Sequence, residues 1–208
     1  MPDPVLLERL RRAVHPLDAA PGGDPWNLEE LQGLLSPGMP REAAVLLGVV
    51  DRPSAPSVLM TRRHDGLRHH AGQVSLPGGR IEPDDRDPAA AALREASEEV
   101  GLDPVQATVL GYLDPLLTIT GFRVVPVLAM IDAEFTPVPD PAEVADVFEV
   151  PLALLLDPDR LERIELQFGG RPRSVLQYRY PPQRIWGVTA SILFNLRERL
   201  AHAIPGRI

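Results

Sequence analysis

Three glutamates, Glu95, Glu98 and Glu99, are spaced three and four residues apart, which places their side chains on one face if the segment is helical. Like charges one turn apart cost a helix about 0.2–0.5 kcal/mol, and acidic residues near its carboxyl end oppose the helix dipole. Such a face is often simply solvated. Three carboxylates on one face are also suited to binding a hard divalent cation, Mg²⁺ or Mn²⁺.

The segment around these glutamates predicts a helix over residues 87–100. Asp87 is a favourable N-cap, and Pro88 suits the first helical position, where its missing N–H is not needed. Gly101 stands where a left-handed C-terminal stop belongs. The predicted apolar face consists of Ala89, Ala92, Leu93, Ala96 and Val100.

The residues before this helix add backbone groups to the acidic face. Gly78 and Gly79 lack side chains, so their backbone can approach a ligand closely, although a glycine pair alone indicates only a turn. A backbone oxygen beside three carboxylates is suited to a divalent cation. Arg94 could reach a neighbouring carboxylate and orient it.

Together these residues resemble the Nudix box, G-x5-E-x7-R-E-U-x-E-E-x-G-U, in which U is aliphatic. The second half of the box is intact over residues 94–102 (REASEEVGL), and the first half corresponds to residues 79–85 (GRIEPDD). Asp85 stands in place of the first glutamate of the box, and eight residues instead of seven separate it from Arg94. The extra residue falls in the loop before the helix, where it need not disturb the carboxylates.

The upstream residues resemble the L-L-T-x-R-S-x3-R-x3-G-x3-F-P-G-G signature of the coenzyme A pyrophosphatase subgroup. The corresponding residues are 59–64 (LMTRRH), Arg68, Gly72 and 76–79 (LPGG), with the same spacings after Arg68. Met60, His64 and Leu76 depart from the signature. The subgroup also shares the extra residue in the box and the segment 185–190 (IWGVTA). The resemblance covers residues 40–200, most of the chain.

The resemblance implies an α/β fold, a Nudix-type α/β/α sandwich with a mixed sheet, and metal-dependent hydrolysis of the coenzyme A diphosphate to 3′,5′-ADP and 4′-phosphopantetheine. It assigns Mg²⁺ or Mn²⁺ to Glu95, Glu98, Glu99 and the Gly79 carbonyl, with Arg94 orienting the carboxylates. The identity of the general base stays open between Glu95 and Glu143. Glu143 lies outside the box, and an acidic residue in such a position more often only begins a helix.

Arg62, Arg63 and Arg68 place three permanent positive charges just before the acidic residues. Guanidinium groups bind phosphate in a bidentate manner, so we expect these arginines, with Gly78, to bind substrate. The alternative is that they pair with nearby acids or stay solvated. Two other functions stay open: a Nudix hydrolase of another nucleoside diphosphate derivative, such as ADP-ribose, and a non-catalytic nucleotide-binding Nudix module.

The length of 208 residues favours a single domain over residues 1–208, with a helix and a Pro/Gly-rich extension in 1–40 and the core in 40–200. Apolar periodicity predicts helices at 5–14 and 185–200, a helical turn around 28–35, and strands at 43–50, 57–61, 107–113, 123–131, 147–150, 163–168 and 174–180.

The composition excludes several classes of protein. The net charge is −8, and all 21 basic residues are arginine, which argues against sequence-independent nucleic-acid binding. The absence of cysteine excludes disulfides and thiolate metal sites. No segment is typical of a signal peptide or a membrane span, so we expect a cytoplasmic protein whose partner is a small molecule. The oligomeric state is left open.

Overall fold

The computed structural model describes the chain except for residues 1–2, 32–33, 35–37, 68–69, 169 and 204–208. The α-helices are α1 (Pro4–Arg12), α2 (Pro88–Val100), α3 (Leu152–Leu156) and α4 (Gly187–His202). The strands are β1 (Arg41–Val50), β2 (Ser57–Arg63), β3 (Val74–Ser75), β4 (Gly78–Arg80), β5 (Ala107–Tyr112), β6 (Leu116–Leu117), β7 (Phe122–Ile131), β8 (Val144–Pro151), β9 (Leu161–Phe168), β10 (Arg171–Tyr180) and β11 (Gln183–Trp186). Short 3-10 helices cover Glu29–Leu31, Pro104–Gln106 and Pro158–Arg160.

The large sheet is mixed, as predicted. Its strand order is β3-β2-β1-β7-β5, while β4 pairs with β1, β6 with β7, and β8 with β2. β1 and β7 run parallel and pair along ten residues, and the other neighbours are antiparallel. This parallel pair is the centre of the sheet, so both of its faces need a covering layer.

One edge of β1 is divided between two partner strands. Ala43, Ala44 and Val45 pair with β4, whereas Val49 and Val50 pair with β2. Between these segments the Leu46 amide donates to the carbonyl of Pro77 at 2.7 Å. The division inserts the Leu76–Gly79 segment into the sheet, so the glycine pair has a fixed position relative to β1.

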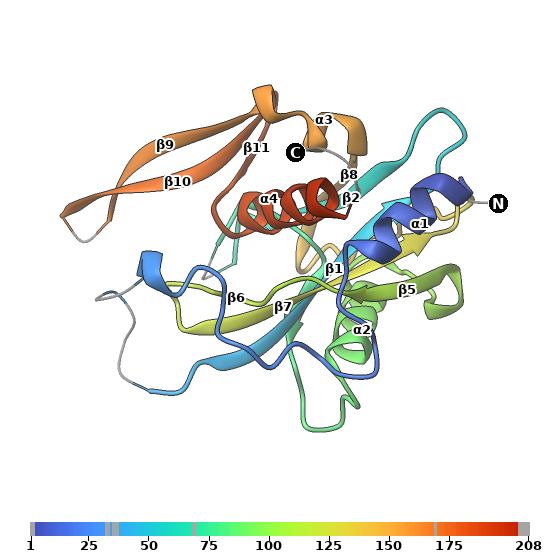
Figure 1. Cartoon of the computed structure of the whole chain (residues 1–208), viewed down its shortest axis with the longest axis horizontal. Coiled ribbons are helices and arrows are strands. Elements are labelled where there is room, and N and C mark those ends of the chain that lie inside the picture. The colour runs from blue at the N-terminus through green and yellow to red at the C-terminus, as the bar shows by residue number, and fades with distance from the viewer. Residues whose placement is uncertain (1–2, 32–33, 35–37, 68–69, 169, 204–208) are drawn as a thin grey trace.

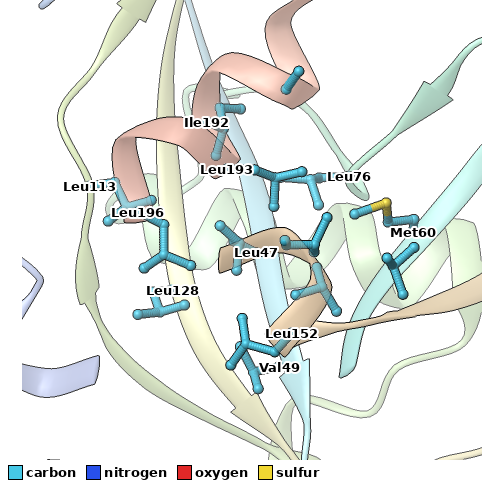
Figure 2. Packing of buried hydrophobic residues seen from close by; sticks show 14 of the residues in the cluster. Leu47, Val49, Met60, Leu76, Leu113, Leu128, Leu152, Ile192, Leu193 and Leu196 are labelled. Atoms are coloured by element: carbon cyan, nitrogen blue, oxygen red, sulfur yellow. The ribbon is translucent and has the colours of Figure 1, made fainter. Parts of the chain in front are cut away.

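Helices cover both faces of the sheet (Figure 1). Alternate residues of β1 point to opposite faces: Ala44, Leu46 and Val50 belong to the cluster with the alanines of α2, whereas Leu47 and Val49 belong to the cluster with α4. Figure 2 shows this second cluster, in which Leu47 lies among Leu193, Leu196 and other apolar side chains. The two cores explain why β1 and β7 are almost continuously apolar.

A separate three-stranded antiparallel sheet, in the order β11-β10-β9, follows α3. Its β9–β10 hairpin extends away from the body of the protein (Figure 1). At the other end of the hairpin, Leu176 and Tyr178 of β10 are buried in the cluster that contains α4. The hairpin is therefore anchored at its base.

The elements predicted from the sequence differ from the structure at several points. Residues 185 and 186 were predicted as helix but form the end of β11, because Gln183–Trp186 pairs with Gln177–Tyr180 and the helix begins only at Gly187. β3, β4, β6 and α3 were not predicted, since segments of two to five residues carry little periodicity. The turn expected around 28–35 is a 3-10 helix at Glu29–Leu31, and residues 32–33 and 35 lie outside the described residues.

The N-terminal segment is attached to the sheet by specific polar contacts. The buried Asn27 side chain donates to the Leu117 carbonyl at 2.9 Å and accepts from the Leu117 amide at 2.8 Å. His15 and Tyr112 exchange backbone hydrogen bonds, and Asp114 accepts hydrogen bonds from Arg199. Across the described ranges, no helix is long and apolar enough to cross a membrane.

Candidate active site

Helix α2 positions the three glutamates as the sequence predicts. The Asp87 carboxylate accepts a hydrogen bond from the Ala90 amide at 2.8 Å, which caps the helix at its start. Gly101 has φ 69° and ends the helix in the left-handed conformation. Ala91, Ala92 and Ala96 are fully buried under the sheet, so the helix is held in one rotation about its axis.

Glu99 is the most buried of the three glutamates, with 4% of its surface exposed. Burial raises its pKa to about 8, although the positive charge of Arg63 acts in the opposite direction. Arg63 Nη1 lies 3.8 Å from Glu99 Oε1, and Oε2 has no hydrogen-bond partner among the described residues. A buried carboxylate with an unsatisfied oxygen is a strong candidate for binding a cation.

Glu95 lies half-buried beside the glycine pair. Burial raises its pKa, and the hydrogen bond from Arg94 Nη1 at 3.0 Å opposes that shift. A Cβ added at Gly79 would lie 2.5 Å from the Glu95 carboxylate. Glycine is therefore required at position 79 for this carboxylate to pack against the backbone.

Arg94 connects the acidic face to the loop before the helix. Its Nε and Nη2 donate to the two oxygens of Asp85 at 3.1 and 3.0 Å, and Nη2 also donates to the Arg80 carbonyl at 3.1 Å. Hydrogen bonds from Arg94 lower the pKa of Asp85, and Asp85 in turn raises the pKa of Arg94. From the sequence, Asp85 is only a departure from the Nudix box. Its position, where the box has its first glutamate, is the signal that indicates a contact with Arg94.

The third glutamate, Glu98, is exposed and lies 3.4 Å from Arg94 Nη1. No three His, Asp or Glu side chains within the described ranges form a ready-made metal site. The donor set nevertheless fits a hard divalent cation, because Glu99 offers an unsatisfied buried oxygen and Glu95 packs beside the backbone of Gly79. The roles predicted for Glu95, Glu98, Glu99 and Gly79 as metal ligands stay predictions.

The structure separates the arginines that the sequence grouped together. Successive residues of β2 point to opposite faces, so Arg63 faces Glu99 while Arg62 forms an ion pair with Asp65 at 3.1 Å. Arg68 lies outside the described residues. Gly78 is required by the sheet, since φ is 155° and an added Cβ would lie 2.6 Å from Val45 Cα. Its predicted contact with substrate is untested.

Glu143 lies in the turn immediately before β8, on the same side of the protein as the helix carboxylates. Its carbonyl accepts from the His64 amide at 2.8 Å, one residue after Arg63. Its negative charge makes a small contribution to raising the pKa of both Glu95 and Glu99. The structure therefore brings Glu143 within electrostatic range of the acidic face, although the sequence places it more than 40 residues away.

An open hollow of about 720 Å³ lies beside the first turns of α2. Asp85 and Arg94 contribute to its wall, but Glu95, Glu98 and Glu99 do not. Leu17 from the N-terminal segment and Tyr112 from β5 also line it. The three glutamates do not line this hollow, so it is not assigned to the active site.

Comparisons with known proteins identify the family. The family model described as NUDIX domain matches residues 39–168. The chain belongs to the Nudix family. Two curated relatives, from Yersinia pestis (strain Pestoides F) and Yersinia pseudotuberculosis serotype O:1b (strain IP 31758), are each 40% identical over 161 residues, which is 77% of this chain and 80% of the relative. Both carry the name "Uncharacterized Nudix hydrolase NudL".

The family assignment makes this chain a Nudix hydrolase, and such enzymes generally use divalent metal ions. Among solved structures, the Nudix hydrolase RenU from M. smegmatis aligns with a TM-score of 0.53 at 24% identity and covers 82% of this chain and 91% of RenU. At that identity the likeness concerns the fold alone. It agrees with the α/β fold and the mixed sheet predicted from the sequence.

Proposed function

We propose that this Nudix hydrolase cleaves the diphosphate of coenzyme A, or of a coenzyme A derivative, to 3′,5′-ADP and 4′-phosphopantetheine. The observation that carries the proposal is the position of the upstream signature. Its segment in β2 ends at Arg63, whose guanidinium lies 3.8 Å from Glu99. The segment that resembles the coenzyme A subgroup therefore reaches the carboxylates of the Nudix box at Arg63.

The turn after β2 supports this proposal, because the residues at its far end form backbone hydrogen bonds with Arg63. The Arg63 amide donates to the Gln73 carbonyl at 3.0 Å, and the Gly72 amide donates to the Arg63 carbonyl at 3.2 Å. Gly72 has φ 69°, and an added Cβ would lie 2.8 Å from the Asp65 carboxylate. Gly72, the glycine of the signature, thus allows the chain to turn back to Arg63.

Arg63 is suited to bind a phosphate of the substrate. Its Nε is buried and has no acceptor among the residues that the structure describes. A guanidinium with a free N–H beside carboxylates that bind a cation can donate to a phosphate oxygen. We assign Arg63 to the diphosphate, and Arg62, Arg68 and the Gly78 backbone to further substrate contacts.

The reaction needs a bound cation, an oriented set of carboxylates and a proton acceptor. Mg²⁺ or Mn²⁺ would neutralise the charge of the diphosphate so that water can attack phosphorus. We assign its binding to Glu95, Glu98, Glu99 and the Gly79 carbonyl, with Arg94 orienting Glu95 and Glu98. Glu95 or Glu143 would accept the proton of the attacking water.

Substrate profiling tests the proposal. The purified chain is assayed with Mg²⁺ or Mn²⁺ on coenzyme A, ADP-ribose and dinucleoside polyphosphates, and the products are identified by mass spectrometry. We expect 4′-phosphopantetheine, with a kcat/KM for coenzyme A at least about tenfold above the other compounds. A higher value for ADP-ribose would assign the enzyme to that substrate class, and binding without hydrolysis would support a non-catalytic module.

Three variants connect the activity to the site. Glu99→Gln should lower kcat by about 100-fold or more, since several kcal/mol of metal-assisted stabilisation is lost. Arg63→Gln should raise KM for coenzyme A more than Arg62→Gln does, because Arg62 is already paired with Asp65. Equal effects of the two arginine substitutions would contradict the assignment of Arg63 to the diphosphate.

A further inference from the structure

The β9–β10 hairpin has a feature that the hydrolase activity does not explain. Strand β9 pairs with β10 over eight residues without an irregularity, and it pairs with no other strand in the described part of the chain. Its outer edge therefore presents a row of unpaired backbone N–H and C=O groups. Proteins usually protect such edges with proline, charged side chains (lysine above all), a bulge or a covering element.

Strand β9 lacks most of these protections. Its sequence, LERIELQF, contains no proline and no lysine, and its pairing with β10 shows no bulge. Glu162 is engaged within the hairpin, since its carboxylate accepts from Gln177 Nε2 at 2.9 Å. Arg163 and Glu165 are exposed, and neither forms an ion pair with another described residue. These two charges remain available to a partner.

The charged residues of β9 are ordered so that two copies of the strand, paired antiparallel, can be complementary in charge. When two identical strands pair antiparallel about a two-fold axis, the residue on the axis faces its own copy and the residues on either side face each other. An axis at Glu162, Arg163 or Glu165 would bring two like charges together. An axis at Ile164 instead places Arg163 of each chain directly opposite Glu165 of the other.

We propose that β9 is a dimerisation edge, on which two copies of this chain pair antiparallel about Ile164. The pairing joins the two three-stranded sheets into one continuous six-stranded ribbon. It satisfies the backbone groups of both edges and forms two Arg163–Glu165 ion pairs on one face, with the two Ile164 side chains in contact on the other. The candidate active sites, which lie where α2 packs on the large sheet, are not altered by this contact.

Charge exchange between the two residues tests the proposal. The wild-type mass is measured by light scattering and sedimentation over a dilution series, and we expect a dimer. Arg163→Glu and Glu165→Arg each replace two opposite-charge contacts with two like-charge contacts, so each should weaken dimerisation by about tenfold or more. The double variant, Arg163→Glu with Glu165→Arg, should restore the dimer to within about twofold of the wild type.

A mixture of the single variants separates contact between chains from an effect within one hairpin. One variant carries two acids at these positions and the other carries two arginines, so a mixed pair regains both complementary contacts. We expect the mixture to form a heterodimer, detected by native mass spectrometry with one chain isotope-labelled. Gln167→Glu is the matched control, because it places its charge opposite the neutral Leu161, and it should leave the dimer essentially unchanged.

Circular dichroism and hydrolase activity verify that each variant is folded. A monomeric wild-type protein across the dilution series would overturn the proposal. A dimer that is unaffected by both single substitutions, or single variants that do not form a heterodimer when mixed, would overturn the pairing about Ile164 and require a different interface.

Discussion

Asp85 and Arg94 form a two-point ion pair across the loop that leads into α2, with Oδ1 and Oδ2 of Asp85 accepting from Nε and Nη2 of Arg94. The Asp85 side chain is 7% exposed, and the Glu82 amide also donates to its Oδ2 at 2.8 Å. The remaining donor of the guanidinium, Nη1, is directed to Glu95 and Glu98. The loop thereby fixes the arginine that contacts two of the three carboxylates.

Removal of this ion pair is expected to reduce both activity and stability. Asp85→Ala should lower the free energy of unfolding by about 1–3 kcal/mol, since a charged hydrogen-bond partner of Arg94 is lost. Because Arg94 then loses its fixed orientation, kcat should fall further than the loss of folded protein explains. The measurements are urea unfolding and steady-state kinetics under conditions where the variant is folded.

The longer carboxylate is the control for this substitution. Asp85→Glu retains the charge and restores the residue that the family box has at this position, so it should lose less activity than Asp85→Ala. Equal activity of Asp85→Ala and the wild type would contradict an orienting role for the pair.

The two glycines before α2 are expected to respond differently to alanine. At Gly79 the added Cβ meets the carboxylate of Glu95, which is the flexible end of a side chain and can move away. Gly79→Ala should therefore reduce activity by about tenfold or more while the unfolding temperature stays close to the wild-type value.

At Gly78 the added Cβ meets the backbone of Ala44 and Val45, and φ of 155° disfavours any side chain. Gly78→Ala should therefore lower the unfolding temperature. Scanning calorimetry and activity assays on both variants distinguish the two effects. If Gly79→Ala is the less stable variant, the proposed displacement of Glu95 is wrong.

Asn27 is expected to be the main anchor of the N-terminal segment near β6. Asn27→Ala leaves the amide and carbonyl of Leu117 without their partner, which should cost about 1–3 kcal/mol. Hydrogen exchange should then become faster in residues 15–31 and at Leu117. Asn27→Asp keeps the acceptor for the Leu117 amide but places a charged acceptor oxygen against the Leu117 carbonyl in a buried site, so it should destabilise the segment at least as much. Uniform exchange across the chain would indicate global destabilisation instead.

Glu149 is expected to contribute stability that depends on pH. Burial acts to raise its pKa, but hydrogen bonds from Arg52 and Ser57 outweigh this effect, and the net pKa lies below the ordinary glutamate value. Because the pKa is lower in the folded state, the stabilisation is fully present above the ordinary value of about 4.3 and is lost as the pH falls through the folded pKa.

Glu149→Gln measures this contribution. At neutral pH the substitution should lower the free energy of unfolding by about 1–3 kcal/mol, since the charged contact with Arg52 is weakened. The difference from the wild type should shrink as the pH falls below about 4. Urea unfolding at several pH values provides the test, and a difference that does not change with pH would show that the charge of Glu149 is not responsible.

The sequence predicts the helix of the active site well because its signals are local. Asp87, Pro88 and Gly101 each act on the neighbouring backbone, and the structure has the helix at Pro88–Val100. The strand β4 was missed, because Gly78 and Gly79 carry no apolar pattern and pair only after β1 is in place. Ile185 was misassigned for a similar reason, since its strand depends on pairing with Tyr178.

The candidate site also combines features that local sequence predicts with features that depend on tertiary contacts. The alignment of Glu95, Glu98 and Glu99 on one helix face was predictable from spacing alone. The difference between Arg62 and Arg63 follows from the alternation of a strand, so a period of two residues could have indicated it. The pairing of Asp85 with Arg94 depends on the path of the loop between β4 and α2, and only the position of Asp85 in the family box indicates it.

The divided edge of β1 has a consequence for how the length of this chain can vary in evolution. Residues 78–80 are held in register by β1, and α2 is held by its alanines against the sheet. An insertion in either element would turn side chains to the wrong face. The loop at residues 82–86 lies between the two elements and belongs to neither, so a family can gain or lose a residue there while the glutamates keep their geometry, provided that the Asp85 carboxylate still reaches Arg94.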